Sequence, residues 1–532
     1  MTTGELLSAL RKLNVRLRIE GDQLRCSAPK GTLTPTLRQA LKEQKSAVIA
    51  FLRQAETALQ SKLIPLVPIP RDQELELSYA QERLWFLQQL EPGSVSYNIA
   101  VGLELRGRLN EAGLAQSLAE IVRRHEVLRT RFATRLGKPV QVIEAAGLRM
   151  GVADLSGLSE EQREAEARRL AGEEAGRGFD LSEGPMLRVR LLRLGEEKQV
   201  VLVTMHHIVS DGWSMGVMAG ELRQLYEAYA SGGRSSLGEL AIQYADYALW
   251  QRRWLSGDCL AMHLDYWKGQ LQGELPEIVL PGVKSVTQPL NHCRAVLAVQ
   301  MPQGLCEELK ILSRRQCVTL HMTLLAAFQT LLHRYTGITD IVVGSPVANR
   351  NREEIEGLIG VFENMLVMRA DMSGNPTFVE LLHRVRDITL GAFGHHDLPF
   401  ERLVEELHQE RRLSHTPIIH IAFALQDAPI RSLEVAGFTL TQIPGPTDGS
   451  KLDLTLCLWD EKETLGGYVE YNAELYDKDT MIRLVSHLQV LLESIVAQPK
   501  ARIADLPVLT DAEKQALLNK PGRQSDVRRR RR

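Results

Sequence analysis

A predicted strand that ends in two adjacent histidines and leads directly into a predicted helix constrains this chain more than any other segment. The β-branched, apolar run 199–204 predicts a buried strand, and MHHIVSDG (205–212) follows it. Apolar residues at helical spacing then predict a helix over 213–230. Imidazoles beside the free N–H groups of a helix start place a proton acceptor next to hydrogen-bond donors. Chemistry that moves a proton while charge grows on a carbonyl oxygen requires that combination.

The two histidines are expected to have different environments. Successive side chains of a strand point to opposite faces, so one of His206 and His207 is expected in the core and the other toward a cavity. The same geometry argues against a shared metal ion, and no metal site is predicted. Asp211 can orient the imidazole, cap the following helix or pair with an arginine. Two structural histidines and a capping aspartate explain this segment alone equally well.

Composition excludes several classes of protein. With 532 residues the chain is too long for one ordinary core, so two or three domains are expected. A net charge of −2, without a basic stripe, gives no reason to expect nucleic-acid binding. The six cysteines are scattered without a CxxC pair, which is typical of reduced thiols. No signal peptide or apolar run of about 18 residues is present, and a cytoplasmic location is expected.

The N-terminal part looks like a separate unit. Residues 1–58 combine two amphipathic helical segments with an alternating hairpin over 15–28, which turns at Gly21-Asp22. Residues 59–74 include three prolines within 63–70 and predict an extended linker. From Leu75 onward, strands and helices alternate irregularly, which indicates an α/β (α+β) fold. Nothing after Leu509 is expected to pack.

Five further segments are individually weak signals. Each one alone is explained by an amphipathic helix start, a charged surface, aromatic packing or a loop. The segments are SYAQERLWFL (78–87), RHEVLRTRF (124–132), YADYALW (244–250), IGVFEN (359–364) and HHDLPFE (395–401). Together with MHHIVSDG, and in this order, they resemble the condensation domain of nonribosomal peptide synthetases over roughly 75–510. GGYVEYN (466–472) also resembles this family. The SDGWS sequence (210–214) is most similar to the subtype that joins an L-configured donor to an L-configured acceptor.

The resemblance implies a fold and a reaction. Two chloramphenicol-acetyltransferase-like lobes, 75–260 and 261–510, would form a V around a central tunnel, followed by a linker or tail over 511–532. Two carrier proteins would bring substrates on phosphopantetheine arms, and no cofactor would be bound directly. The acceptor amine would attack the donor thioester and form an amide.

The resemblance also implies roles for the histidine motif. His207 would face the reacting amine, either as a base or as a positioning group, while His206 would be structural. The backbone N–H of Gly212 would help to stabilise the oxyanion.

An arginine partner is expected for Asp211. Arg350 is the first candidate for this ion pair, and Arg129 or Arg131 is the alternative.

Four departures from the family pattern bear on the substrate. Glu363 stands where the family usually has a smaller or apolar residue, Met365 replaces a hydroxyl residue and His396 replaces a common glutamine. Residues 411–417 follow the late arginine-serine-proline segment only loosely. Glu363 is expected beside the substrate channel, which puts donor selectivity in doubt but leaves the reaction class unchanged.

The N-terminal unit resembles the TubC-type docking domain of such synthetases. This resemblance implies capture of the C-terminal tail of an upstream synthetase protein. Arg16, Arg18 and Arg25 on the hairpin would favour an acidic tail that adds as a strand. The alternative is a packing appendage of the condensation lobes.

Other functions remain open at this stage. An epimerisation domain shares the fold and motif, but SDGWS argues against it. A stand-alone acyltransferase and a noncatalytic recruitment platform are further alternatives. LPVLTD (506–511) resembles the start of a linker to an adenylation domain, so a longer assembly-line protein is expected.

Overall fold

The computed structural model describes residues 16–20, 23–27, 45, 64–145, 147–284, 294–411, 418–426, 432–435, 438–443, 452–461 and 464–519. The chain divides into two compact units. The smaller unit combines Met1–Val67 with Trp250–Met262, and the larger combines Pro68–Leu249 with His263–Arg532.

The smaller unit contains the predicted hairpin. Strand β1 (Arg16–Glu20) pairs with β2 (Gln23–Ser27) in antiparallel register, and position 18 lies opposite position 25. The amphipathic helices expected in 1–58 lie outside the described residues. In the same unit the indole N–H of Trp250 donates to the Ile64 carbonyl oxygen at 3.0 Å.

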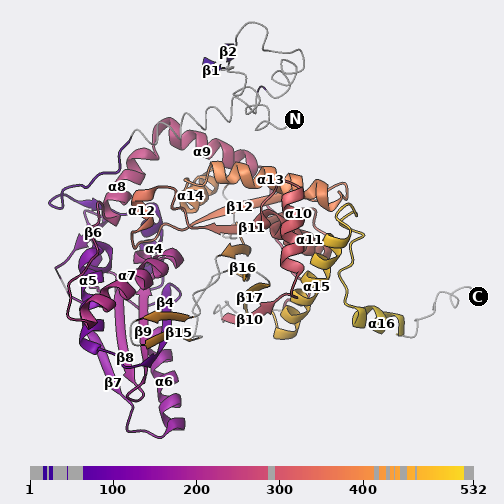
Figure 1. Ribbon diagram of the computed structural model, residues 1–532. Coiled ribbons are helices and arrows are strands. Elements are labelled where there is room, and N and C mark those ends of the chain that lie inside the picture. The colour runs from indigo at the N-terminus through magenta and orange to yellow at the C-terminus, as the bar shows by residue number, and fades with distance from the viewer. Residues whose placement is uncertain are drawn as a thin grey trace, which may run out of the picture. The chain divides into compact units, whose positions relative to one another are not determined.

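The first large sheet of the larger unit contains the histidine motif (Figure 1). All neighbouring strands in it are antiparallel except β7 and β8, which are parallel. In spatial order its strands are β14 (Ser432–Val435), β15 (Phe438–Ile443), β4 (Asn98–Gly107), β9 (Lys198–His206), β8 (Leu187–Arg193) and β7 (Met150–Asp154).

The second large sheet is mixed, because β13 pairs in parallel with both β11 and β16. In spatial order its strands are β10 (Arg294–Gln300), β17 (Leu465–Asn472), β16 (Leu454–Asp460), β13 (Ile421–Gln426), β11 (Asp340–Val347) and β12 (Asn364–Asp371). A small third sheet comprises β3 (Leu75–Glu76), β6 (Lys138–Ile143) and β5 (Thr130–Arg135).

The two sheets do not divide the chain at residue 260. Strands β14 and β15 come late in the sequence, yet β15 pairs with β4 at the edge of the first large sheet, with Phe438 opposite Gly107. The expected division into lobes 75–260 and 261–510 therefore does not hold for this segment. Strand pairing is a non-local choice, so local sequence patterns did not reveal the crossing.

Helices cover both sheets, and several of them begin at a side chain that caps the first turn. The Ser78 hydroxyl accepts from the Gln81 N–H at 3.2 Å and starts α4 with a capping box. The helices of the larger part of the chain are α4 (Tyr79–Leu90), α5 (Glu111–Arg124), α6 (Glu160–Ala175), α7 (Gly212–Ala230), α8 (Tyr244–Trp254), α9 (Gly257–Gln270), α10 (Leu305–Arg315), α11 (Leu320–Thr336), α12 (Glu353–Glu356), α13 (Phe378–Gly394), α14 (Phe400–Arg411), α15 (Lys478–Ala497) and α16 (Asp511–Asn519).

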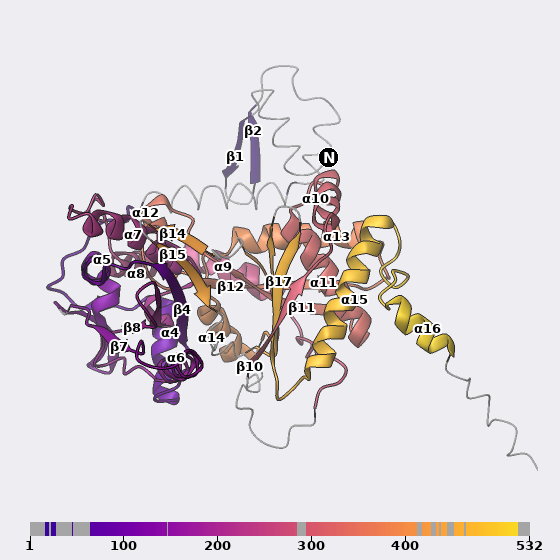
Figure 2. The same ribbon diagram turned by 60° about the horizontal axis from the view of Figure 1, so that its bottom comes forward.

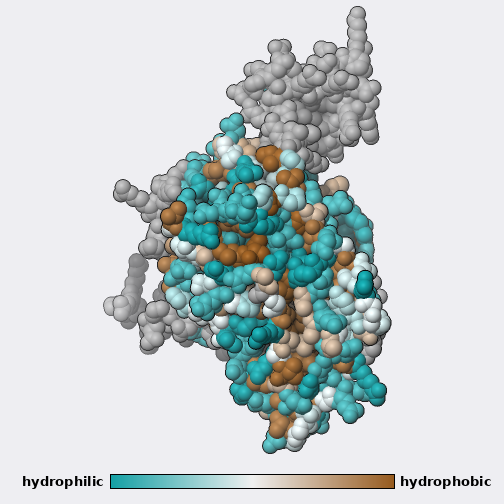
Figure 3. All heavy atoms as spheres, turned by 90° about the vertical axis from the view of Figure 1, so that its left-hand side faces the viewer, coloured by the Kyte–Doolittle hydropathy of each residue, from teal (hydrophilic) through white to brown (hydrophobic). Residues whose placement is uncertain are grey.

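Helix α11 is the central helix beside the second large sheet. It is buried without interruption from Met322 to Leu332 and contacts β11, β13, α10, α13 and α15 (Figure 2). Of the described helices, α15 alone is long and apolar enough to cross a membrane. Its buried side chains lie where it contacts α10 and α11, so core packing accounts for its hydropathy. Figure 3 shows apolar side chains interspersed with hydrophilic ones on another face of the molecule.

The end of the described chain is more ordered than the sequence suggested. Helix α16 follows Leu509, and its residue Glu513 accepts from the Thr510 hydroxyl at 2.7 Å. The Glu513 carboxylate also lies 2.8 Å from Nε2 of His487 on α15. The expectation that nothing after Leu509 packs is therefore wrong only for Glu513, because the other residues of α16 whose burial is described are exposed. These contacts are polar, and apolar periodicity in the sequence does not reveal them.

Candidate active site at the end of strand β9

Strand β9 brings the histidine motif to the boundary between a sheet and a helix. Its apolar residues are buried; β4 and β8 pair with its two edges, and helix α6 contacts the strand. The strand ends at His206, and a single 3-10 turn (His207–Val209) follows. The backbone N–H of His207 donates to the Tyr97 carbonyl oxygen at 2.8 Å, which fixes the start of this turn.

His206 lies in the core. Its side chain is fully buried, Nδ1 accepts from the Ile208 N–H at 3.1 Å, and the Tyr97 and Phe179 rings lie against it. Burial lowers the pKa of His206 to about 3, so the ring is neutral near pH 7. These contacts match the buried position expected for one of the two histidines.

His207 is half-buried and has one ring nitrogen fixed by the backbone. Nδ1 lies 2.6 Å from the Ser210 carbonyl oxygen. A carbonyl oxygen only accepts, so Nδ1 carries the proton and donates it in this hydrogen bond. In the neutral ring Nε2 then holds a lone pair, and no described residue occupies it with a hydrogen bond. The arrangement provides an accessible proton acceptor or amine-positioning atom.

Asp211 both caps α7 and pairs with an arginine. Oδ1 accepts from the Ser214 N–H at 2.8 Å and lies 3.1 Å from Nη2 of Arg350. Oδ2 accepts from the Phe362 N–H at 2.9 Å. The side chains of Asp211 and Arg350 are 2% and 1% exposed, so this ion pair is removed from water. Two of the roles considered for Asp211 are therefore combined in one carboxylate.

Arg350 is bound on several sides. Nη1 donates to the carbonyl oxygens of Ile355 at 2.6 Å and Leu358 at 2.7 Å. Nη2 donates to the Ser214 hydroxyl at 2.9 Å, and the guanidinium lies 4.1 Å from the centre of the Phe362 ring. Burial lowers the pKa of Arg350, while the neighbouring Asp211 carboxylate opposes that shift. The guanidinium thus links α7 to the chain around residue 360.

The family motifs converge on residues 358–362, which we call the strap. Gly360 lies so close to the Tyr244 ring that an added Cβ would come within 2.0 Å of it, so a side chain would not fit there. Four side chains hold the backbone of the strap by hydrogen bonds. Three accept from its N–H groups: His125 Nδ1 from Ile359 at 3.3 Å, Ser214 Oγ from Gly360 at 3.0 Å and Asp211 Oδ2 from Phe362 at 2.9 Å. The fourth, the Tyr244 hydroxyl, donates to the Val361 carbonyl oxygen at 2.7 Å.

Sequence reasoning missed three members of this network. Tyr244 was read as aromatic packing, yet its hydroxyl is buried and also lies 2.8 Å from the Ser78 hydroxyl. His125 and Arg124 were read as charged surface, but both are buried and contact Glu221. The sequence signal that could have revealed them is the presence of polar side chains among apolar residues at helical spacing.

The start of α7 is open. Gly212 is exposed, and among the described residues no atom beyond its chain neighbours and its own helix lies within 4 Å of the position that its Cβ would occupy. Trp213 is 45% exposed, and its indole N–H donates to the Glu356 carbonyl oxygen at 2.9 Å. The first N–H groups of a helix lack partners within the helix and favour negative charge. A growing oxyanion is the kind of charge that such a helix start stabilises.

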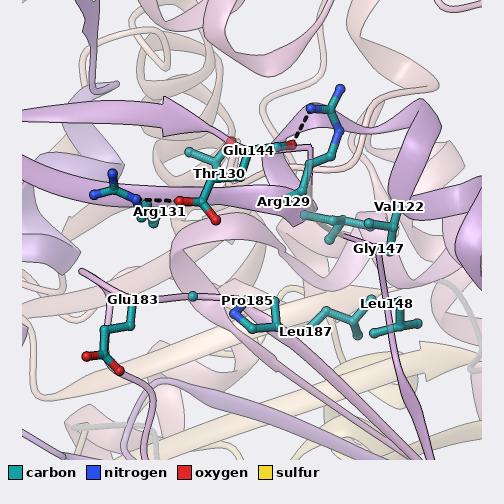
Figure 4. Close-up of a pocket in the computed structure, with 12 residues that line it drawn as sticks. Val122, Arg129, Thr130, Arg131, Glu144, Gly147, Leu148, Glu183, Pro185 and Leu187 are labelled. Atoms are coloured by element: carbon teal, nitrogen blue, oxygen red, sulfur yellow. Dashed lines mark hydrogen bonds and ion pairs between the residues drawn. The ribbon is translucent and has the colours of Figure 1, made fainter.

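Arg129 and Arg131 do not reach Asp211. Nη1 of Arg129 donates to the Glu144 carbonyl oxygen at 2.7 Å, and Nε of Arg131 donates to the Glu144 carboxylate at 2.6 Å (Figure 4). Both arginines line a small cavity of about 60 Å³ that also contacts Leu187. None of the proposed site residues lines it. Arg350 is therefore the arginine that pairs with Asp211.

The departures from the family pattern occupy different environments. Ring nitrogen Nε2 of His396 lies 3.1 Å from the Asn351 amide, and Nδ1 contacts the Phe393 carbonyl oxygen. Met365 lies opposite Pro346 in the pairing of β12 with β11. Glu363 is exposed immediately after the strap. Residues 412–417 lie outside the described part of the chain.

The hairpin arginines can be placed by backbone register alone. Positions 16 and 18 lie two apart on β1, and position 25 is opposite position 18, so the three positions share one face of the hairpin. Within the described residues no cluster of three potential metal ligands occurs.

Comparisons with known proteins identify the class. The family model for the condensation domain matches residues 71–518, and the model for the TubC N-terminal docking domain matches residues 4–54. The chain therefore belongs to the condensation-domain family, and it carries a docking domain of the TubC type at its N-terminus.

Relatives with this similarity are peptide synthetases. A linear gramicidin synthase protein of Brevibacillus parabrevis is 45% identical over 477 residues, which cover 89% of this chain and 6% of the synthase protein. Phosphinothricin tripeptide synthetase PhsC of Streptomyces viridochromogenes is 39% identical, with 88% of this chain and 44% of that protein covered. The chain thus spans less than half the length of these relatives.

Solved structures confirm the predicted fold class. The X-domain from teicoplanin biosynthesis matches with a TM-score of 0.75 and 28% identity, covering 84% of this chain and all of the X-domain. The first condensation domain of the CDA synthetase matches with a TM-score of 0.67 and 22% identity, covering 82% of this chain and all of that domain. Condensation domains are acyltransferases that form amide bonds in nonribosomal peptide synthesis, which confirms the predicted class of enzyme.

Proposed function

We propose that His207 is the centre of an amide-forming reaction between two carrier-bound substrates. The amine of the acceptor attacks the carbonyl carbon of the donor thioester, so a C–N bond forms and the C–S bond breaks. The amine proton passes to Nε2 of His207 and then to the departing thiolate of the donor's phosphopantetheine arm. Carrier proteins on either side supply both substrates.

The geometry of His207 carries this proposal. Its Nδ1–H is committed to the Ser210 carbonyl oxygen, which leaves the Nε2 lone pair available to an amine. A general base contributes roughly 10²–10⁴-fold to a rate, and positioning alone contributes comparably or more. Either role uses the same atom.

The remaining site residues prepare this position. Asp211 and Arg350 hold the start of α7 against the strap, so the turn that carries His207 is fixed. The N–H of Gly212 stabilises the oxyanion of the tetrahedral intermediate. His206 supports the turn from the core through Ile208.

The proposed organisation places this reaction within a larger assembly line. We assign residues 1–58 to docking and 59–74 to a linker, with Arg16, Arg18 and Arg25 receiving the acidic C-terminal tail of an upstream synthetase protein. An adenylation domain would follow the condensation domain in the full-length protein. The scattered cysteines support a cytoplasmic location.

The experiment is a reconstitution with two loaded carriers and mass spectrometry of the products. His207→Ala is expected to reduce amide formation at least 100-fold without unfolding, because the half-buried ring contributes little packing. His383→Ala serves as the matched control, since His383 is also half-buried and makes none of the contacts described above. Wild-type yield from His207→Ala would refute the catalytic assignment.

The same assay separates the alternative functions. An inverted donor without an amide would indicate an epimerisation domain. No product from the wild-type chain with any loaded pair would favour a recruitment platform. That alternative has a structural counterpart, since the X-domain of similar fold was solved in complex with OxyB.

A further inference from the structure

Glu363 is an exposed acidic residue between two buried neighbours in the sequence. Phe362 and Asn364 are 2% and 6% exposed, whereas Glu363 is exposed. Alternation of this kind is typical of an extended segment whose successive side chains point in opposite directions. The Glu363 carboxylate therefore points away from the core that holds the strap.

The backbone at Glu363 is fixed on both sides. The Phe362 N–H donates to Asp211 Oδ2 at 2.9 Å. The Asn364 side-chain amide donates to the carbonyl oxygens of His396 at 2.6 Å and Leu398 at 2.8 Å. The backbone that carries the Glu363 side chain is therefore ordered before a ligand binds, which limits the entropy cost of binding to the side chain itself.

The position of Glu363 is linked to that of His207. His207 Nδ1–H binds the Ser210 carbonyl oxygen, Asp211 is the next residue, and the Asp211 carboxylate binds the residue before Glu363. Solvent reaches Glu363, yet the protein atoms around it displace much of the bulk water and raise its pKa, while the charge of His207 lowers that pKa and the charge of Asp211 raises it. The Glu363 carboxyl thus lies within electrostatic reach of the proposed catalytic histidine.

Apart from the electrostatic influence of His207, no described side chain offsets the charge of Glu363. Asp211 is already paired with Arg350. Among the described residues, none forms an ion pair or hydrogen bond with the Glu363 carboxylate. A partly desolvated carboxylate without a partner is stabilised most by a cation that arrives with a ligand.

We infer that Glu363 is a specificity-determining residue that binds an ammonium group of a substrate beside His207. The inference rests on the proposed condensation function and names the substrate chemistry for the same site. The attacking amine must be neutral to react, so the ammonium group is a second, non-reacting one. Two sources carry this chemistry: the free α-amine of a single-residue donor, and a basic side chain.

Binding of unreactive substrate mimics tests the inference without requiring catalysis. Three pantetheine amides serve as probes: alanyl, with an α-ammonium group; N-acetylalanyl, with no charge; and N-acetyl-lysyl, with a side-chain ammonium group. Calorimetric titration of the full chain is expected to show about tenfold tighter binding of one ammonium probe than of N-acetylalanyl. Whichever ammonium probe is preferred identifies the source.

Glu363→Gln tests the role of the carboxylate, because it keeps the size and removes the charge. It is expected to abolish the preference while leaving the affinity for N-acetylalanyl pantetheine amide unchanged. Glu353→Gln is the matched control, since Glu353 is an exposed carboxylate nearby in sequence. The preference should persist in that variant.

Two results would overturn the inference: equal binding of all three probes by the wild-type chain, or a preference retained by Glu363→Gln. Neither depends on turnover. Loss of the His207 assignment in the reconstitution assay would therefore leave the binding result interpretable, and the two proposals fail separately.

Discussion

The ion pair between Asp211 and Arg350 depends on the presence of both partners. Each side chain is almost completely removed from water, so each charge has lost its hydration. The attraction between the two charges, and the surrounding hydrogen bonds, offset that loss. Removing one partner therefore costs more than the net contribution of the pair.

We expect Asp211→Asn to destabilise the larger unit by about 3–5 kcal/mol, because Arg350 remains as a buried, unpaired cation. Arg350→Met should cost a similar amount. The double variant should cost less than the sum of the two, and urea unfolding midpoints followed by tryptophan fluorescence measure this coupling. Additive effects within about 0.5 kcal/mol would show that the two charges are not coupled.

Individual residues were predictable where local geometry decided their environment. The alternation of a strand predicted one buried and one accessible histidine, and the family resemblance indicated that His206 is the buried one. The strap was not predictable, because its partners His125, Ser214 and Tyr244 come from three distant segments. The family resemblance supplied Arg350 as a candidate, and only the three-dimensional contacts distinguished it from Arg129 and Arg131.

Elements were predictable where the spacing of apolar residues was regular along the whole element. The apolar run before the histidines became β9, and the helical spacing after them became α7. Strands β1 and β2 of the predicted hairpin pair in antiparallel register. The pairing of β15 with β4 was missed because the two strands are far apart in sequence, and α16 was missed because its contacts are polar.

The docking hairpin gives a prediction at the scale of one element. Replacing Arg16, Arg18 and Arg25 with glutamate should weaken binding of an acidic, glutamate-rich peptide at least tenfold at low salt, since one face of the hairpin changes sign. Fluorescence anisotropy measures this affinity. Condensation between two loaded carriers at high concentration should remain unchanged.

A control for the hairpin variant is a triple substitution in the larger unit that changes the net charge by the same amount. Arg108, Arg135 and Arg234 are exposed in the larger unit, and their replacement by glutamate should leave peptide binding intact. Equal weakening by both triple variants would show a general charge effect. Unfolding of a chain that lacks residues 1–63 would favour the packing appendage instead.

Buried neutral histidines make the stability of the whole molecule depend on pH. Burial lowers the pKa values of His206 and His263 to about 3 and those of His321 and His395 to about 4. Unfolding restores ordinary values near 6.5, so the unfolded chain binds more protons below that pH. We expect these histidines not to lower the free energy of unfolding above about pH 6.5. Toward pH 4 this free energy should fall by up to about 1.4 kcal/mol per histidine per pH unit.

Thermal unfolding midpoints at pH 7.5 and 5.5 test this dependence. His206→Asn provides the matched variant, because an asparagine oxygen can replace Nδ1 as acceptor for the Ile208 N–H while removing one protonation site. The decrease between the two pH values should be smaller in this variant. An unchanged midpoint of the wild-type chain at pH 5.5 would contradict the prediction.

The pairing of β15 with β4 also has a consequence for how the chain is made. During synthesis on a ribosome, β4 emerges long before the strand that covers its edge, a delay on the order of tens of seconds. An uncovered strand edge is a template for aggregation. Chimaeras that join the halves of two different synthetases near residue 260 therefore have to transfer the strand that completes β4 as well, or leave the nascent first half exposed.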